Sequence, residues 1–276
     1  MALTVNTNMA SQRAANSLNN TMGNLSNTLS RISTGLRVTK AADDAAGMAV
    51  ATNLSTQARS GRQAIRNAND GISVIQTAES ASKEVLNILD RMRELSVQSS
   101  SETLADGERD YINDEFDDLS NEVQRIAKAT EFNDIALADG TTTSLDVQVG
   151  VDSGTSSQVT ITLGNLSSST LGVATGDVDL STASGAQTAI GTIDTAIDSV
   201  NSIRADYGSV QNRLDSSIGT MTSYVESLSA ASSQIMDADY AHETSEMTRL
   251  QVMQQAGVSA LAQAKGMNSS VMQLLG

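Results

Sequence analysis

An unbroken ladder of apolar residues in the C-terminal half constrains this chain more than any other feature of its sequence. Its members recur at alternating steps of four and three residues, and only Arg204, Gln211 and Ser232 among them are neither apolar nor aromatic. The ladder comprises positions 193, 197, 200, 204, 207, 211, 214, 218, 221, 225, 228, 232 and 235. This spacing predicts a coiled-coil helix that extends on the order of 65 Å and needs a partner along its length.

Helical spacing also governs both ends of the chain. The sequence contains no proline, so no ring clash forces a helix to stop. Gly35 is a plausible left-handed cap for the first helix, and the segment 38–47 offers Thr39, Asp43 or Asp44 as the cap of the next. The two terminal seams comprise Leu18, Met22, Leu25, Leu29 and Ile32 near the N-terminus, and Leu250, Met253, Gly257, Ala260, Ala264, Met267, Val271 and Leu274 near the C-terminus.

The middle of the chain changes character. Helix-favouring sequence runs from about 46 to 99, and a second, shorter helix is expected around 112–126. Apolar residues then alternate with small or polar ones, which predicts a β-hairpin at about 143–163 that turns near 152–154. The segment 164–186 is rich in Ser, Thr and Gly, and we expect a loop with too little apolar surface to form its own core.

Because heptad helices occupy both ends and the β-like segment lies between them, the chain must fold back on itself. The predicted fold is mainly α, a long antiparallel coiled-coil-like helical bundle built from both termini with a small β-hairpin. The outermost seams are rich in Ala, Gly, Ser and Met, too little to hold an isolated helix pair together in water. We therefore expect the residues of both terminal seams to pack against other subunits.

Composition excludes several classes of function. A net charge of -15 disfavours nucleic acid as a partner, and the absence of cysteine excludes disulfides and thiolate metal sites. Neither a cleavable leader nor a long apolar membrane segment is recognisable, and no motif supplies a nucleophile, base or phosphate-binding loop. We expect no enzyme, no cofactor and no membrane partner.

One acidic group permits two interpretations. It contains Asp237, Asp239, His242, Glu243 and Glu246. Read as a metal site, it lacks a recognisable ligand spacing. Read as the capped start of a helix, it places acidic side chains at the positive end of the helix dipole, and we prefer this second interpretation with no metal bound.

Several separated motifs resemble those of bacterial flagellins, in the same order. On the N-terminal side they are RISTGLRVTKAADDAAGMA (31–49), RNANDGISVIQTAE (66–79), RMRELSVQ (91–98) and EFN (131–133). On the C-terminal side they are RADYGSVQNRL (204–214), ESL (226–228), IMDAD (235–239) and the final Leu274-Leu275. The chain is similar to the family at both ends and over nearly everything between.

This resemblance implies a structural subunit of the flagellar filament, used for swimming motility. Residues 1–45 with 234–276 would form an inner domain that lines the filament core and is disordered in the monomer, and 46–233 an outer domain. Large variable outer domains are lacking, so this is a minimal form. The implied partners are identical subunits, an export chaperone, the filament cap and hook-junction proteins. The implied location is extracellular, reached by flagellar type III export without a cleavable signal peptide.

Some expectations stay open at this point. Arg91, Leu95 and Glu115 align with flagellin positions that contact an innate-immune Toll-like receptor, but they equally fit interhelical packing and a surface charge pair. The hydroxyls at 167–170 are either O-glycosylation sites or an unmodified solvated loop. A hook–filament junction protein shares the terminal helical design, and an intracellular coiled-coil signalling protein is a more distant alternative.

Overall fold

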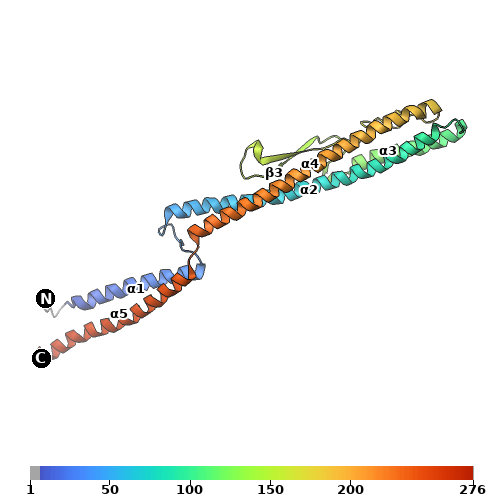
Figure 1. The fold of residues 1–276 in the computed structure, drawn as a ribbon. Coiled ribbons are helices and arrows are strands. Elements are labelled where there is room, and N and C mark those ends of the chain that lie inside the picture. Colours follow the sequence, from blue (N-terminus) through green and yellow to red (C-terminus); the bar gives the residue numbers. More distant parts are fainter. Residues whose placement is uncertain (1–6, 276) are drawn as a thin grey trace. The chain divides into compact units, whose positions relative to one another are not determined.

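The computed structural model describes the backbone of residues 7–275 and the side chains of residues 7–266. It is mainly helical, as predicted (Figure 1). The helices are α1 (Met9–Thr34), α2 (Ala45–Ser99), α3 (Asp106–Ala129), α4 (Ala183–Met236) and α5 (Tyr240–Leu275). Two small antiparallel sheets pair β1 (Glu131–Phe132) with β2 (Ile135–Ala136), and β3 (Ser144–Gln148) with β4 (Gln158–Thr162).

The chain divides into two units. The terminal unit comprises Met1–Gln57 and Glu226–Gly276, and the central unit comprises Ala58–Val225. Helices α2 and α4 contribute residues to both. The predicted inner and outer domains had their boundary at 45/46 and 233/234, and that division stays a prediction.

In the central unit, α2 and α4 run antiparallel. Arg93 pairs with Asp194, and Glu79 pairs with Arg204. A later residue of α2 therefore lies beside an earlier residue of α4. Helix α3 packs on both of them. The shared core contains Val85, Leu89 and Met92 of α2, Phe116 and Val123 of α3, and Ile193 and Val200 of α4.

The predicted ladder on α4 is confirmed, since every one of its positions from Ile193 to Ile235 is buried or half-buried. The three polar members are half-buried rather than buried. Arg204 lies at the edge of this buried face, and its Nη2 lies 3.7 Å from Glu79 Oε1, so its charge is paired. The heptad spacing therefore identified the buried face of this helix correctly.

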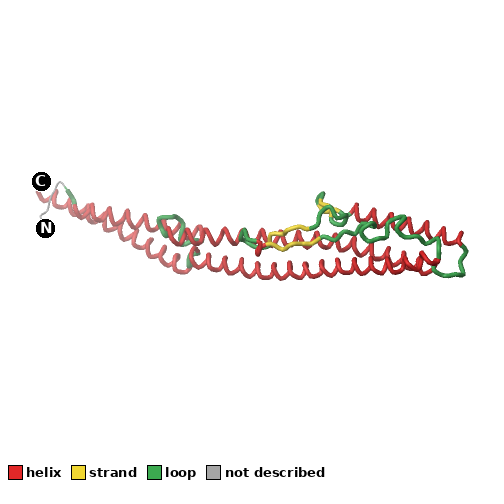
Figure 2. The backbone as a smooth tube through the Cα atoms, turned by 90° about the horizontal axis from the view of Figure 1, so that it is seen from above, coloured by secondary structure: helices red, strands yellow, loops and turns green. Residues whose placement is uncertain are grey.

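The predicted hairpin is the β3–β4 pair, which lies along the helices of the central unit (Figure 2). Its inner face joins Ile161 and Leu163 to Ile75 of α2 and Leu214 of α4 in a second core cluster. Gly71 of α2 permits the approach, because a Cβ there would lie 3.1 Å from Val147 Cγ2.

The turn of this hairpin contains the predicted residues 152–154 at its centre. The connection spans 149–157 and includes a short 3₁₀ turn, Thr155–Ser157. A second, smaller hairpin was not predicted. Its strands β1 and β2 are joined by Asn133 and Asp134, both with positive φ (50° and 62°), which is the conformation of a two-residue hairpin turn.

The loop after the hairpin joins the core of the helices instead of forming one of its own. It lies on the helical core and contributes five buried apolar residues to it: Leu166, Leu171, Val173, Val178 and Leu180. Helix side chains hold its backbone, since Ser99 Oγ donates to Leu180 O (2.6 Å) and Asn113 Oδ1 accepts from Leu180 N (2.9 Å). The irregular spacing of these residues concealed their burial.

In the terminal unit, α1 and α5 run antiparallel and lie side by side in both views (Figures 1 and 2). Asn8 Nδ2 donates to Ala264 O (2.8 Å), near the start of one helix and late in the other. The caps follow from the sequence: Asn8 Oδ1 accepts from Ser11 N at the start of α1, and Gly35 ends that helix with φ 71°. Of the three candidates for the cap of α2, Asp44 accepts from Gly47 N (2.8 Å).

Backbone bonds in the terminal unit hold the segment after α1 against the end of α4. Arg37 N donates to Met236 O (2.6 Å), and Ala238 N donates to Gly35 O (2.9 Å). The Arg37 guanidinium also donates to Ile235 O (2.6 Å). These bonds fix residues 35–37, which follow α1, to residues 235–238, which precede α5.

Candidate assembly surface

The contact between α1 and α5 uses a different set of α1 residues from the predicted seam. On α1, the side chains turned toward α5 are Ala14, Leu18, Thr21, Leu25, Thr28 and Ile32, which are all buried or half-buried. Thr21 and Thr28 are only 7% and 5% exposed. The hydroxyl of Thr21 is satisfied because it donates to Ser17 O (3.0 Å).

The predicted seam on α1 is therefore divided in two. Leu18, Leu25 and Ile32 lie in the contact with α5, but Met22 and Leu29 are 48% and 56% exposed beside it. Within one molecule the five residues therefore do not share one contact with α5. Packing of all five against other subunits stays a prediction.

Helix α5 shows the same division. Leu250 is buried, Gly257 and Ala264 are half-buried, and Gln254 and Leu261 complete the stripe that faces α1. Met253 and Ala260, predicted in the seam, are exposed, together with Val252 and Val258. The side chains of the remaining predicted seam residues, Met267, Val271 and Leu274, lie outside the described residues.

An ion pair that the sequence did not suggest crosses the seam. Arg31 Nη1 lies 3.4 Å from Glu243 Oε1, and the Glu243 side chain is 7% exposed. A carboxylate at this depth needs a partner, since an unpaired buried charge is costly. The signal available in the sequence was an acidic residue on the inner stripe of a predicted amphipathic helix.

The acidic group at 237–246 acts as the capping interpretation expects. Asp239 Oδ1 accepts from Ala241 N (2.9 Å) and His242 N (3.2 Å) at the start of α5. Glu246 pairs with Arg249 on the next turn. Among the described residues, no group of three or more His, Asp or Glu side chains is arranged to hold a metal ion.

Arg91 and Glu115 form a surface ion pair between α2 and α3. The Nη2 of Arg91 lies 2.8 Å from Glu115 Oε1, and its Nη1 lies 3.0 Å from Glu94 Oε2. These bonds, first of all the one to Glu115, raise the pKa of Arg91. Leu95 is 1% exposed in the core beneath, so it can serve a receptor contact only by supporting Arg91. The receptor contact itself stays a prediction.

The four hydroxyl residues at 167–170 are not equivalent. Ser167 and Ser168 are each 6% exposed, and Ser168 Oγ donates to Gln124 Oε1 (3.1 Å). Ser169 and Thr170 are exposed. The expectation of a fully solvated loop is therefore wrong for the first two residues.

Two long helices, α1 and α5, pair with each other and still leave apolar side chains exposed, which is typical of a subunit that packs against further copies. In the part of the chain that is described, no helix has the length and apolar character needed to cross a membrane. The candidate site is the extended surface that the exposed apolar residues of α1 and α5 form.

Comparison with known proteins identifies the family. The family model of the bacterial flagellin N-terminal helical region matches residues 5–143, and that of the C-terminal helical region matches residues 190–275. The chain belongs to the bacterial flagellins. It is a structural subunit of the flagellar filament, a self-assembling extracellular polymer of identical subunits.

Two relatives show how complete the match is. A flagellin of Halalkalibacterium halodurans is 40% identical over 271 residues, which cover 98% of this chain and 99% of that protein. Flagellin B of Vibrio cholerae is 30% identical over 378 aligned positions that cover 100% of both proteins. Since this chain has 276 residues, it is a minimal form that lacks large variable outer domains.

A solved structure with a different description shares the fold. A Vibrio parahaemolyticus structure, provisionally described as a flagellar hook-associated protein, matches with a TM-score of 0.58 over 71% of this chain and 100% of that chain. The identity is 16%, so this likeness concerns the fold only. The sequence matches over both helical regions decide in favour of flagellin.

Proposed function

We propose that the α1/α5 pair builds the interior of the filament by burying its outer apolar stripes against neighbouring copies. The observation that supports this is the exposure of Met22 and Leu29 on α1 and of Val252 and Val258 on α5, at 48–61%. The inner domain of the proposal comprises residues 1–45 and 234–276.

The energies favour assembly over a self-sufficient pair. Isolated helices are marginal in water because nucleation is unfavourable, and the seam of this pair contains threonines, a glycine and half-buried leucines. Burial of a fully exposed Met, Leu or Val side chain adds about 1.5–3 kcal/mol, so each of these half-exposed side chains adds about half of that. Several such side chains in each copy therefore add stabilisation in the polymer that the isolated α1/α5 pair lacks.

Seeded polymerisation of the full-length protein tests the proposal. The double variant Met22→Asp/Leu29→Asp should leave the central unit folded, as circular dichroism reports, but should fail to extend filament seeds in electron micrographs. Asn20→Asp/Asn27→Asp is the matched control, because it places two charges at the same spacing on exposed polar positions of the same helix. Normal growth of the Met22/Leu29 variant, or equal loss of growth in the control, contradicts the proposal.

The proposal extends to the export route and the partners that the family resemblance implies. The subunit leaves the cell by flagellar type III export without a cleaved signal peptide, and it meets an export chaperone, the filament cap and hook-junction proteins on the way. Its role is structural rather than catalytic, in keeping with its family. N-terminal sequencing of subunits from sheared filaments tests the export route, and a subunit cleaved after an N-terminal leader would contradict it.

Recognition by the Toll-like receptor is part of the same proposal. Arg91 and Glu115 are half-exposed neighbours on the surface of α2 and α3, with Leu95 beneath them. Arg91→Ala should reduce receptor activation by monomer. Arg125→Ala, which removes a similar exposed ion pair on α3, should not. Equal activation by both variants counts against recognition through Arg91 and Glu115.

A further inference from the structure

The two units differ in charge. Acidic and basic residues are nearly balanced in the terminal unit, so almost the whole net charge of -15 belongs to the central unit. Within the central unit the charge is again uneven, because one stretch of α2 is basic and the outer face of α3 is acidic. Two exposed stripes of opposite sign result.

The basic stripe lies on α2. Arg59, Arg62 and Arg66 follow one another at steps of three and four residues, which places them on one face, and all three are exposed. Arg66 donates from Nε to Gln63 Oε1 (3.1 Å). Among the described side chains, no carboxylate forms an ion pair with Arg62 or Arg66. Like charges at this spacing destabilise a helix slightly, so the stripe favours an acidic partner.

The acidic stripe lies on α3. Asp110, Asp114 and Asp118 are exposed at steps of four residues, and none of them has an ion-pair partner in the described part of the chain. The pKa of the neighbouring Asp117 is raised, first by burial and then by the negative charges of Asp114, Asp118 and Asp179. These aspartates carry the opposite sign to Arg62 and Arg66.

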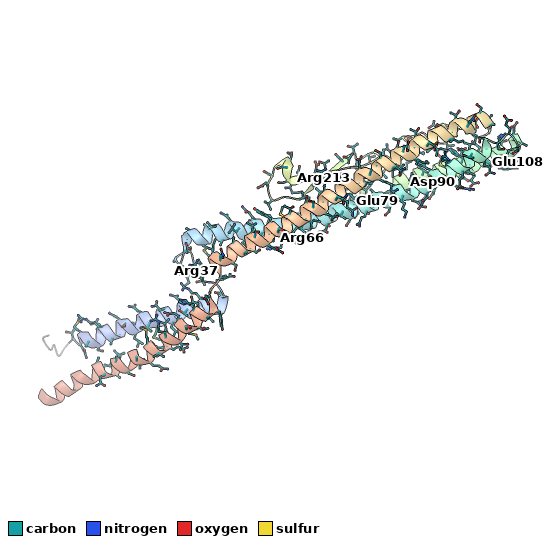
Figure 3. All side chains as sticks on the ribbon, viewed as in Figure 1. Arg37, Arg66, Glu79, Asp90, Glu108 and Arg213 are labelled. Carbon is teal, nitrogen blue, oxygen red and sulfur yellow. The ribbon has the colours of Figure 1, made fainter. Side chains whose placement is uncertain are left out.

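One molecule cannot neutralise the two stripes against each other. The Arg91–Glu115 pair fixes where α3 lies along α2. Arg62 lies roughly 40 Å from Arg91 along that helix. In Figure 3, Arg66 of α2 and Glu108 in the first turn of α3 lie in distant parts of the central unit. Opposite charges this far apart along one molecule can meet only between two copies.

We propose that the arginine stripe 59–66 of one subunit binds the aspartate stripe 110–118 of a neighbouring subunit in the filament. The stripes are opposite in sign and similar in length, since they extend about 10 Å and about 12 Å along their helices. Two different surfaces of the same chain form a heterologous contact, which generates an open polymer. The inference rests on the assembly proposed above.

Such a contact determines the orientation of an incoming subunit more than it strengthens the binding of that subunit. Exposed ion pairs are weak and are screened by salt within about 10 Å at 0.1 M ionic strength, whereas complementary charge raises association rates and suppresses wrong registers. Subunits with a net charge of -15 also repel one another. A local contact between opposite charges therefore acts mainly on the rate at which subunits add to the filament end.

A charge-swap series with the full-length protein tests the proposal. Arg62→Glu/Arg66→Glu and Asp110→Arg/Asp114→Arg should each slow seeded growth about tenfold at low salt, and the difference should shrink at high salt. The variant with all four changes should recover most of the wild-type rate. Lys83→Glu/Lys128→Glu is the matched control, because it changes the net charge as the first variant does but lies outside the basic stripe, and it should grow close to normally.

The outcomes separate this inference from the proposed assembly. Failure of the four-change variant to recover, with its thermal unfolding unchanged, overturns the pairing of stripes. Growth rates that follow net charge alone, control included, overturn it as well. If wild-type protein itself does not extend seeds, the assembly function fails first. Recovery by the swap supports the pairing.

Discussion

The two units use the same heptad spacing and differ in what covers it. In the central unit, α3, the hairpin and the loop 163–182 close over α2 and α4, and side chains as large as Phe116 and Tyr207 are at most 1% exposed. Among the described residues of the terminal unit, α1 and α5 form a two-helix pair, which is the arm. The contact between them includes Thr21, Thr28 and the buried Glu243. Heptad spacing therefore determines which helices pair, whereas a third layer of structure is what closes the core of a unit.

The largest effect should come from the core of the central unit. Phe116→Ala should lower the free energy of unfolding of the monomer by about 3–5 kcal/mol, since it leaves a cavity between three helices. Tyr111→Ala, 78% exposed on the same helix, is the control, with an expected change within about 0.5 kcal/mol. Denaturant unfolding followed by circular dichroism measures both. Similar losses would remove the distinction between a closed core and an open arm.

A smaller effect is expected where α2 and α4 approach closely. A Cβ at Gly61 would lie 2.6 Å from Val225 Cγ2, so Gly61→Ala should destabilise the central unit by about 1–3 kcal/mol. At Gly219 no atom lies within 4 Å of the added Cβ, and Gly219→Ala should stabilise by up to about 1 kcal/mol through helix propensity. Thermal unfolding distinguishes the two signs, and stabilisation by both changes would refute the close approach.

The burial of Tyr207 should appear as a dependence on pH. Burial raises the pKa of this phenol above its ordinary value of 10.0, and Gly164 N donates to its oxygen (3.1 Å). The neutral form is the one that the folded state prefers, so its contribution is complete below about pH 10 and is lost as the pH rises through the raised pKa.

Tyr207→Phe should therefore cost about 1 kcal/mol at neutral pH, because the Gly164 N–H loses its acceptor, and should flatten the loss of stability above about pH 10. Unfolding curves between about pH 8 and about pH 11 measure this. An alkaline loss that is identical in wild type and variant would assign it to other groups.

The smallest effect in the monomer should come from the arm. Leu18 lies over Gly257, where an added Cβ would be 3.2 Å from Leu18 Cδ1. Leu18→Ala should change monomer unfolding by less than about 1 kcal/mol, because the isolated pair is marginal, yet should lower the melting temperature of filaments clearly. A loss of about 2–5 kcal/mol in the monomer, as for a closed core, would show that the arm is stable by itself.

Sequence alone predicted what periodicity encodes. It identified the buried face of α4, the extent of α2, the β3–β4 pair and the Gly35 cap, since each depends on local spacing or on a residue with special backbone freedom. The choice between two diagonals on α1 was not local. Thr21 and Met22 are neighbours, and only the packing of α5 decides which of them is covered.

The irregular segments were the least predictable. Leu166, Leu171 and Val173 follow no period, so their burial depends on the groove that α2, α3 and α4 leave open. The partner of Glu243 was hidden for a similar reason, because Arg31 lies 212 residues away in sequence. Contacts of this kind belong to the assembled fold rather than to any window of the chain.

The way the loop 163–182 is fastened has a practical consequence. Val173 and Val178 are buried on either side of one short turn, whereas residues 175–177 within it are exposed and Gly176 has φ 90°. A foreign peptide spliced into that turn would leave both anchors in place. The molecule thus carries a natural insertion point for displaying an epitope on every copy.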